Sequence, residues 1–261
     1  MSPLEVTKLD DAGRSALERL ILTLADSKRL MGIRYSDWLL GAPSLETGVA
    51  AASMAQDEWG HARLLYAMLK DLGMDPVAVE HDRSAEEYTS IAALDEEMPD
   101  WAALVAAIVL VDGALSAALS SFSTGSFEPA RNRVPKMLAE EEFHTSLGVA
   151  WYRRLAEAGG EARELLTDAT HTMLPGILAW VGAEDDAAEA MVEAGVIGSA
   201  TDRLELYYAA VRELTALVGI DVDSVEKSTD WDPTRGRTGG CVSEEAVERA
   251  RGDRNRALFL E

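Results

Sequence analysis

Two pairs of ionisable residues in this 261-residue sequence have the spacing of metal ligands. Glu58 and His61 are three residues apart in the segment QDEWGHARLLYAM, and Glu141 and His144 repeat that spacing in LAEEEFHTSLGVAW. On a helix, a carboxylate and an imidazole at this separation project from the same side and can reach one metal ion. Each pair falls on a helical stripe that is otherwise apolar, so both pairs are predicted to point into a core.

A third carboxylate is expected inside the protein. Asp112 lies in the middle of the segment WAALVAAIVLVDGALSAALSSF, which is apolar on every side and is therefore predicted to be a buried helix. An ionised carboxylate that is buried without a partner is costly, so Asp112 requires a nearby cation. Two Glu-x-x-His pairs and an inward aspartate match the di-iron carboxylate arrangement, in which the helices of a four-helix bundle direct their ligands into one core.

That arrangement requires one more carboxylate, from a helix near the N-terminus. The apolar stripe of this helix has Lys28 where the ligand is expected, and Asp26 and Arg29 are predicted on its exposed face. The ammonium group either replaces the ligand inside the bundle or extends to solvent from its edge. Inside the bundle, one divalent ion and a protonated Lys28 would balance three carboxylates, whereas two ions would leave excess positive charge. Either one metal ion is absent or Lys28 is neutral with a lowered pKa, and the first alternative is favoured.

The elements that position these residues are predicted to be helices. A period of 3.6 residues runs through most of the chain, without sustained alternation of apolar and polar residues. Four long helices are expected over residues 11–40, 43–72, 101–124 and 128–157, with further helices over 161–182, 184–195 and 200–218 and a short one from Ser243. The predicted fold class is all-α, a four-helix bundle with additional C-terminal helices. One helical domain is expected over residues 1–219, followed by a loop and short helix over 220–261.

Local signals mark several helix ends. Pro43 is predicted in the first turn of the second helix, Gly73 at its C-cap and Asp100 at the N-cap of the third. The segment SAEE, residues 84–87, has the spacing of a capping box. It predicts a short helix in the long connection between the second and third helices.

Charge and composition limit the function. A net charge of -22 disfavours binding to nucleic acid and to anionic membranes, which requires clustered lysine and arginine. Residues 101–124 are long enough to span a membrane, but Asp112 and the lack of basic flanks favour a core helix. No segment resembles a signal peptide, so the cytoplasm is expected. The single cysteine, Cys241, excludes an intrachain disulfide and a cysteine-based metal site.

The sequence resembles the ferritin-like subunits of the bacterial multicomponent phenylacetyl-CoA epoxidase over residues 15–160. The catalytic subunit has a Trp, Ala-Pro-Ser-Leu and Asp-Glu-x-Gly-His at spacings similar to those in DWLLGAPSLETGVAAASMAQDEWGH. Its buried aspartate corresponds to the segment VDGA here, residues 111–114. Its second Glu-x-x-His pair corresponds to EEFH, residues 141–144. The first helix, LADSKRLMGIRYSDW, is closer to the structural subunit, which has lost the metal site. Aligned on Trp38, the first ligand glutamate of the catalytic subunit falls on Lys28.

The resemblance implies a ferritin-like fold and one or two iron ions. It implies metal ligands at Glu58, His61, Asp112, Glu141 and His144, and a catalytic centre that contains Lys28, Glu58, Asp112 and Glu141. In the family, one oxygen atom of O2 is inserted into the aromatic ring of an aryl-acetyl thioester of coenzyme A, with electrons from a reductase. The implied partners are an acyl-CoA substrate, a reductase, and a related ferritin-like subunit or a second copy of the chain.

The sequence leaves three functions open. The first is a divergent oxygenase subunit with an altered metal centre, which the five retained ligands favour. The second is a non-catalytic structural subunit of such a complex, which Lys28 and the first helix favour. The third is a stand-alone ferritin-like metal-binding protein.

Overall fold

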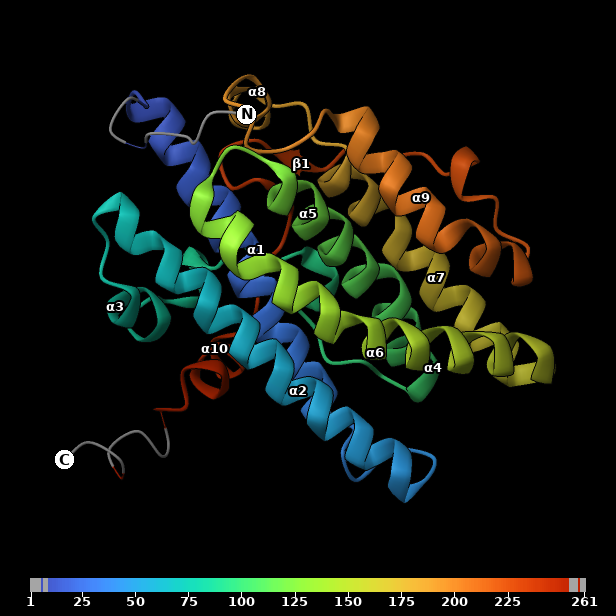
Figure 1. Cartoon of the computed structure of the whole chain (residues 1–261). Helices are drawn as coiled ribbons and strands as arrows, with labels where there is room; N and C mark the ends of the chain where they lie inside the picture. Colours follow the sequence, from blue (N-terminus) through green and yellow to red (C-terminus); the bar gives the residue numbers. More distant parts are fainter. Residues whose placement is uncertain (1–5, 7–8, 254–257, 259–261) are drawn as a thin grey trace.

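Four long helical segments form the core of the computed structural model, which describes residues 6, 9–253 and 258. The first two are α1 (Asp11–Asp37) and α2 (Leu45–Tyr66). The third is a continuous run of α4 (Trp101–Ala107), η5 (Ile108–Asp112) and α5 (Gly113–Thr124), and the fourth is α6 (Glu128–Ala158). In Figure 1, α2 and α6 lie nearest the viewer and run antiparallel, with α1 behind them. The predicted all-α, ferritin-like bundle is confirmed.

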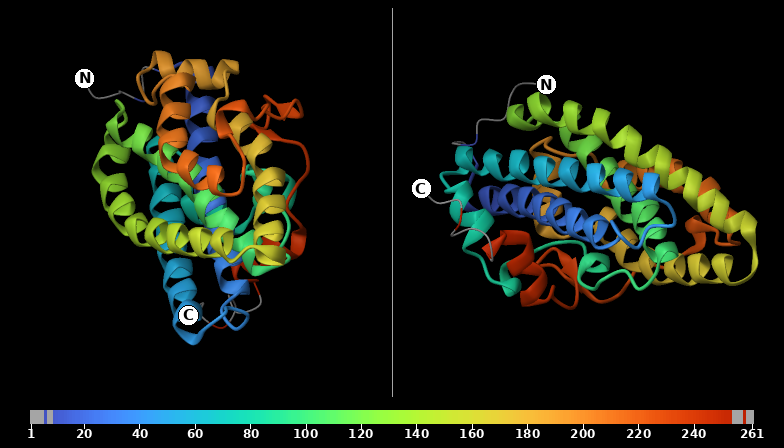
Figure 2. Two further views of the ribbon diagram at one scale, coloured as in Figure 1. Left: turned by 90° about the vertical axis from the view of Figure 1, so that its right-hand side faces the viewer. Right: turned by 90° about the horizontal axis from the view of Figure 1, so that it is seen from below.

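Additional elements pack around this bundle. The helices α7 (Gly160–Val181), α8 (Asp186–Glu193) and α9 (Ala200–Leu217) correspond to the three helices predicted after residue 160. They are followed by η6 (Val222–Ser224) and by a small antiparallel hairpin of β1 (Trp231–Asp232) and β2 (Arg237–Thr238), with Trp231 opposite Thr238. The last helix, α10 (Glu244–Arg251), begins after the predicted Ser243. Figure 2 shows α10 on the opposite side of the bundle from α6.

Local capping explains most helix ends. The side chains of Ser44, Asp100 and Ser243 accept hydrogen bonds from backbone amides in the first turns of α2, α4 and α10. The prediction for Asp100 is confirmed. The prediction for Pro43 is wrong, because Ser44 takes the N-cap position and α2 begins only at Leu45.

Two long helices end earlier than the periodicity predicts. The helix expected to reach residue 40 ends at Asp37, where the backbone amide of Trp38 closes the last turn. The α-helical part of the second helix ends at Tyr66, and the chain continues as the 3-10 segment η2 (Ala67–Leu72). Gly73 ends η2 with a φ of 83°, so its predicted capping role is confirmed.

The connection between η2 and α4 contains three short helical elements. They are α3 (Pro76–His81), η3 (Ala85–Glu87) and η4 (Ala92–Leu94). The capping box predicted at residues 84–87 is present at η3. Only this one of the three was expected, because α3 and η4 are too short to show helical periodicity.

The apolar third segment lies inside the bundle. Residues Trp101–Thr124 are long and apolar enough to cross a membrane, but 83% of their most apolar stretch is buried within the protein. A π-helical turn, η5, interrupts the segment and ends at Asp112. Such turns widen the helix by one residue and change the direction of the side chains on either side.

The prediction that Asp26 and Arg29 face solvent is wrong. Asp26 is fully buried and accepts hydrogen bonds from Tyr66, Arg83 and the backbone of Thr89. Arg29 donates to Glu80 of α3 and to a backbone carbonyl of α10. Polar residues on this face of α1 predict that it is exposed. In the structure, the connection between α2 and α4 and the helix α10 cover it.

A close backbone contact shapes the turn between α1 and α2. A Cβ atom at Gly48 would lie 2.4 Å from the backbone carbonyl oxygen of Leu39. Because Leu39 belongs to the turn that precedes α2, the contact cannot be relieved by rotating a side chain. The absence of a side chain at Gly48 lets the turn fold back onto the first part of α2.

We predict that Gly48→Ala destabilises the protein by about 1–3 kcal/mol, the range for overpacking against a neighbour that cannot move. The matched control is Gly176→Ala in α7, where the nearest atom would be the Thr238 hydroxyl oxygen at an ordinary 3.6 Å. That substitution should be neutral or stabilise by up to about 1 kcal/mol through helix propensity. Urea unfolding followed by circular dichroism measures both changes. Equal effects of the two substitutions would contradict the proposed role of Gly48.

Candidate metal centre

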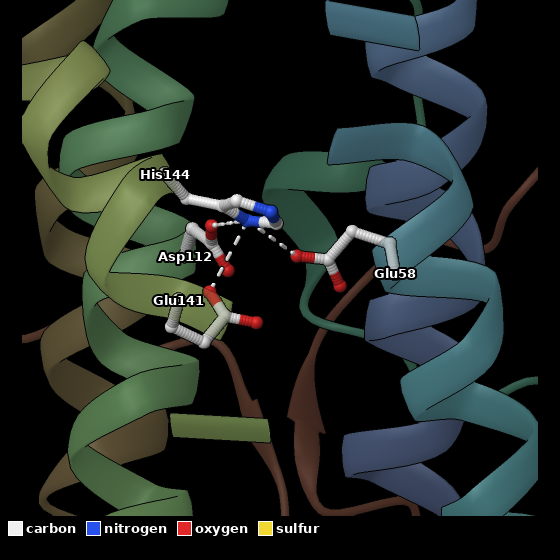
Figure 3. A group of neighbouring side chains, drawn as sticks. All are labelled: Glu58, Asp112, Glu141 and His144. Carbon is white, nitrogen blue, oxygen red and sulfur yellow. Dashed lines mark hydrogen bonds and ion pairs between the residues drawn. The ribbon is translucent and has the colours of Figure 1, made fainter. Parts of the chain in front are cut away.

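The six side chains that the sequence analysis selected meet in the middle of the bundle. They come from all four long segments, and each is exposed by 2% or less: Lys28 from α1, Glu58 and His61 from α2, Asp112 from the end of η5, and Glu141 and His144 from α6. Figure 3 shows Glu58 facing Asp112, Glu141 and His144 across the space between α2 and the other two segments. The helices therefore bring together residues up to 116 positions apart in sequence (Lys28 to His144).

The ammonium group of Lys28 occupies the centre of the three carboxylates. Its Nζ lies 3.0 Å from Glu58 Oε1, 2.5 Å from Asp112 Oδ1 and 2.6 Å from Glu141 Oε1. An ammonium has three N–H groups, so each can be donated to a different carboxylate. The side chain is fully buried, which excludes the alternative in which it extends to solvent.

The two histidines form crossed contacts between α2 and α6. His61 Nε2 lies 2.8 Å from Glu140 Oε2, and His144 Nε2 lies 3.5 Å from Asp57 Oδ2. Each acidic partner directly precedes the glutamate of the opposite Glu-x-x-His pair. The crossing gives the two motifs an approximate two-fold relation, as expected when two similar helices pack antiparallel.

On their inner sides both histidines approach carboxylates. His144 Nδ1 lies 3.1 Å from Asp112 Oδ2, within hydrogen-bond distance. His61 Nδ1 lies 3.0 Å from Glu141 Oε1 but is not directed along a hydrogen bond. Four residues could together hold a metal ion, because one ligand atom from each lies within 4.8 Å of the others: Glu58, Asp112, Glu141 and His144. We call these the converging donors, and His61 is not among them.

The sequence analysis missed three residues that contact the cluster. Two are Asp57 and Glu140, and their signal is the acidic residue directly before each Glu-x-x-His pair. The third is Tyr35, whose hydroxyl donates to Asp112 Oδ2 at 3.0 Å and whose ring meets the His144 ring edge-on at 5.8 Å. Tyr35 lies on the predicted apolar stripe of α1, but nothing in that pattern indicates a hydrogen-bonding role.

Burial and charge act in opposite directions on the cationic residues. Burial opposes the charged form of Lys28, but attraction to Asp112, Glu141 and Glu58 outweighs it and holds the lysine pKa well above its ordinary value. Burial likewise opposes the imidazolium of His144, while its hydrogen bond with Asp112 and its contacts of 3.3 Å with Glu141 and Glu58 raise its pKa to about 12. Both groups therefore carry positive charge at neutral pH.

The carboxylates respond differently to this environment. Burial, followed by repulsion from Asp112, raises the pKa of Glu58 to about 8. Burial would also raise the pKa of Glu141, but attraction to Lys28 and the close imidazole nitrogens of His144 and His61 hold it well below its ordinary value. Cationic side chains therefore balance the ionised carboxylates within the cluster itself. The sequence-based alternative of a neutral Lys28 with a lowered pKa is opposed by this arrangement.

The residues do not fit a metal pair while Lys28 holds this position. The four converging donors have the spacing of a site for one ion. However, Lys28 Nζ is within hydrogen-bond distance of all three carboxylates, between which an ion would have to lie. A divalent ion and an ammonium at that position would repel each other strongly in so dry a site. A metal ion could bind only after the ammonium moved or lost its proton.

The chain matches the sequence model of a known protein family. The sequence model of a family described as phenylacetic acid catabolic protein matches residues 4–240, a range that contains the whole cluster. No curated protein matches the chain.

We predict that Lys28→Met lowers the free energy of unfolding by about 3–5 kcal/mol, because it removes the central cation of a buried ion cluster and leaves the three carboxylates without its hydrogen bonds. The matched control is Lys136→Met. Lys136 also pairs with a glutamate, Glu140 at 3.4 Å, but 74% of its side chain is exposed. That substitution should cost less than about 1 kcal/mol. Urea unfolding at neutral pH measures both, and similar small losses would contradict a central role for the Lys28 ammonium.

Proposed function

The chain belongs to the phenylacetic acid catabolic protein family, and from this premise we propose that it is a non-catalytic structural subunit of a multicomponent oxygenase. The whole complex would act on an aromatic acyl-CoA, receive electrons from a reductase and operate in the cytoplasm. In this proposal the chain contributes the ferritin-like scaffold, and activation of O2 takes place on a related subunit that holds iron.

One observation carries the proposal. Lys28 Nζ lies within 3.0 Å of an oxygen atom of each of the three carboxylates, and the side chain is fully buried. An ammonium can hold carboxylates together by charge and hydrogen bonds, as a metal ion does. It has no vacant coordination position and no accessible redox change, so it cannot bind or reduce O2.

The same contacts give the cluster a structural role. Lys28 joins α1 to α2, to η5 and to α6 through one atom. Any shift of one helix along its axis would leave a carboxylate buried without a donor, which is costly. The cluster therefore favours a single register of the four long segments, which is useful in a subunit whose surface must fit other proteins.

A second candidate function is favoured by two carboxylate oxygens. Glu58 Oε2 and Glu141 Oε2 are buried and have no hydrogen-bond partner among the described residues, although Glu141 Oε2 lies 3.3 Å from His144 Nδ1. Such atoms are unusual in a folded protein, and a bound ion is one of the explanations for them. If the ammonium moved away, Glu58, Asp112, Glu141 and His144 would be the residues that hold one ion, and the divergent oxygenase subunit of the sequence analysis would be the better description. A bound iron ion would supply the O2 and redox chemistry that side chains lack.

Metal analysis of the purified protein tests the proposal. We predict that the native chain binds well below about one transition metal ion per chain, and that Lys28→Glu raises the content toward about two by restoring a fourth carboxylate and removing the ammonium. Elemental analysis after exposure to iron(II) without oxygen measures the content. His61→Ala in the Lys28→Glu background should lower it again.

A surface substitution separates the effect of the site from that of added negative charge. Lys70→Glu changes the net charge by the same amount as Lys28→Glu, but at an exposed position of η2 outside the cluster, and should leave the metal content unchanged. A native protein with two tightly bound iron ions would refute the structural role. A native protein with one ion held in equal amount to the chain would favour the second candidate.

A further inference from the structure

A cavity of about 70 Å³ lies between the core of the bundle and the C-terminal elements. Side chains from α1, α5, α7, α8 and α9 line it, together with Trp231 and Gly236 of the hairpin. Figure 1 shows α8 and β1 at the same end of the molecule as the beginning of α1, which also contributes to the lining. The lining residues differ from those of the cluster around Lys28, so the two sites are separate.

We propose that this cavity binds a small branched aliphatic carboxylate. The carbon chain would occupy the cavity, and the carboxylate would pair with the guanidinium groups in its wall. Such a site does not depend on whether the cluster around Lys28 holds a metal ion.

The floor of the cavity is apolar and made of small side chains. Ala16 of α1, Ala118 of α5 and Met191 of α8 are buried there. The hydroxyl group of Thr23, also in the lining, donates to a backbone carbonyl of its own helix at 2.9 Å. A water molecule in a cavity needs two to four polar partners, which this floor does not supply. The space therefore suits a group made of carbon.

The volume decides between kinds of apolar ligand. Protein interiors rarely leave a void larger than a water molecule, so a cavity of about 70 Å³ is more than a packing defect. An engineered apolar cavity of about 150 Å³ binds benzene in another protein, and the present cavity has about half that volume. A short branched carbon chain fits this space better than an aromatic ring.

Arg203 of α9 brings a buried positive charge to the wall. It is 5% exposed and donates hydrogen bonds to three backbone carbonyl groups at 2.7–2.9 Å. These bonds use three of the five N–H groups of a guanidinium, and carbonyl groups do not carry a full negative charge. Burial lowers the pKa of Arg203, and attraction to Asp185 and other acids does not offset this effect. An anion beside Arg203 would compensate its charge.

The second arginine of the wall, Arg19 of α1, is already paired. It donates to Asp185 at 2.6 Å, and the same carboxylate accepts a hydrogen bond from Trp231 Nε1 at 3.1 Å. Asp185 therefore balances one of the two guanidinium groups in the lining, and one positive charge remains. In a chain with a net charge of -22, this local excess is unusual. It matches a ligand with a single negative charge, because charge-assisted hydrogen bonds to guanidinium are strong.

The mouth of the cavity is formed before a ligand binds. Trp180 of α7, Ala187 of α8 and Trp231 of the hairpin are half-buried, in contrast to the buried floor. Asp185 joins these elements, since it accepts from α1, from the hairpin and from the backbone amide of Ala188 in the first turn of α8. A mouth held in this way loses little conformational entropy when a ligand enters.

Titration of the full chain with 3-methylbutanoate at neutral pH tests the proposal. The chain has six tryptophans, of which Trp180 and Trp231 line the cavity. We expect the indole N–H resonances of these two to shift, and that of Trp151 in α6 to stay in place. The expected dissociation constant is in the millimolar range, which burial of a short carbon chain and one charge-assisted hydrogen bond can supply. Single Trp→Phe variants assign the resonances.

A neutral analogue tests the role of charge. The alcohol 3-methylbutan-1-ol has the same carbon chain without the carboxylate, and it should bind at least about tenfold more weakly than 3-methylbutanoate. Equal binding of the acid and the alcohol would overturn the proposal.

A pair of substitutions in α8 tests the location. Ala187→Leu should fill the cavity and weaken binding of 3-methylbutanoate by at least about tenfold. The matched control is Ala190→Leu, because Ala190 is also half-buried in α8 but does not line the cavity, and this variant should bind as the native chain does. Ala118→Leu fills the same space from α5, and circular dichroism shows which variants fold.

Two results would contradict the site. One is the absence of any shift of the Trp180 and Trp231 resonances with 3-methylbutanoate, as expected if water alone fills the cavity. The other is binding that a folded Ala187→Leu or Ala118→Leu variant leaves unchanged.

Discussion

The interaction on which the bundle depends is the set of three hydrogen bonds from the Lys28 ammonium to Glu58, Asp112 and Glu141. Three carboxylates inside an apolar bundle would lose their hydration and repel one another. One ammonium has an N–H group for each carboxylate, and together with the imidazolium of His144 it compensates their charge, provided that all three carboxylates reach it. Since they belong to different segments, their simultaneous contact defines how α1, α2, η5 and α6 are placed along one another.

Such a cluster contributes more to the choice of structure than to its net stability. The attraction between buried charges is largely offset by the hydration that they lose, whereas a misplaced helix leaves a charge without compensation. A second buried carboxylate on α1 acts in a similar way toward the periphery. Asp26 accepts hydrogen bonds from Tyr66 and Arg83 and from the backbone of Thr89, and so fixes the connection between α2 and α4 against α1. Polar contacts therefore surround α1 on more than one face.

The helices α2 and α6 each carry cluster residues on the inner side and exposed side chains on the outer side. On α2, Glu58 and His61 point inward while Gly60 and Val49 lie on the outer side, and on α6 Glu141 and His144 point inward while Phe143 is exposed. Asp57 and Glu140 lie between the two layers, each in contact with a histidine and partly open to solvent. The centre of the bundle and the exposed sides of α2 and α6 are therefore separated by one layer of side chains.

The sequence by itself determined the helices and the types of residue in the centre. Helical periodicity and caps such as Asp100 and Gly73 depend on neighbours within a few positions, so they can be read from a short stretch of chain. The inward direction of both Glu-x-x-His pairs follows from the same local pattern.

The tertiary structure decided which groups meet. Lys28 finds carboxylates 30, 84 and 113 residues away, and no local pattern states whether such a lysine will reach them or solvent. The burial of Asp26, the crossed partners Asp57 and Glu140, and the π-helical turn before Asp112 likewise depend on how distant segments pack, because burial and pairing are properties of the assembled bundle.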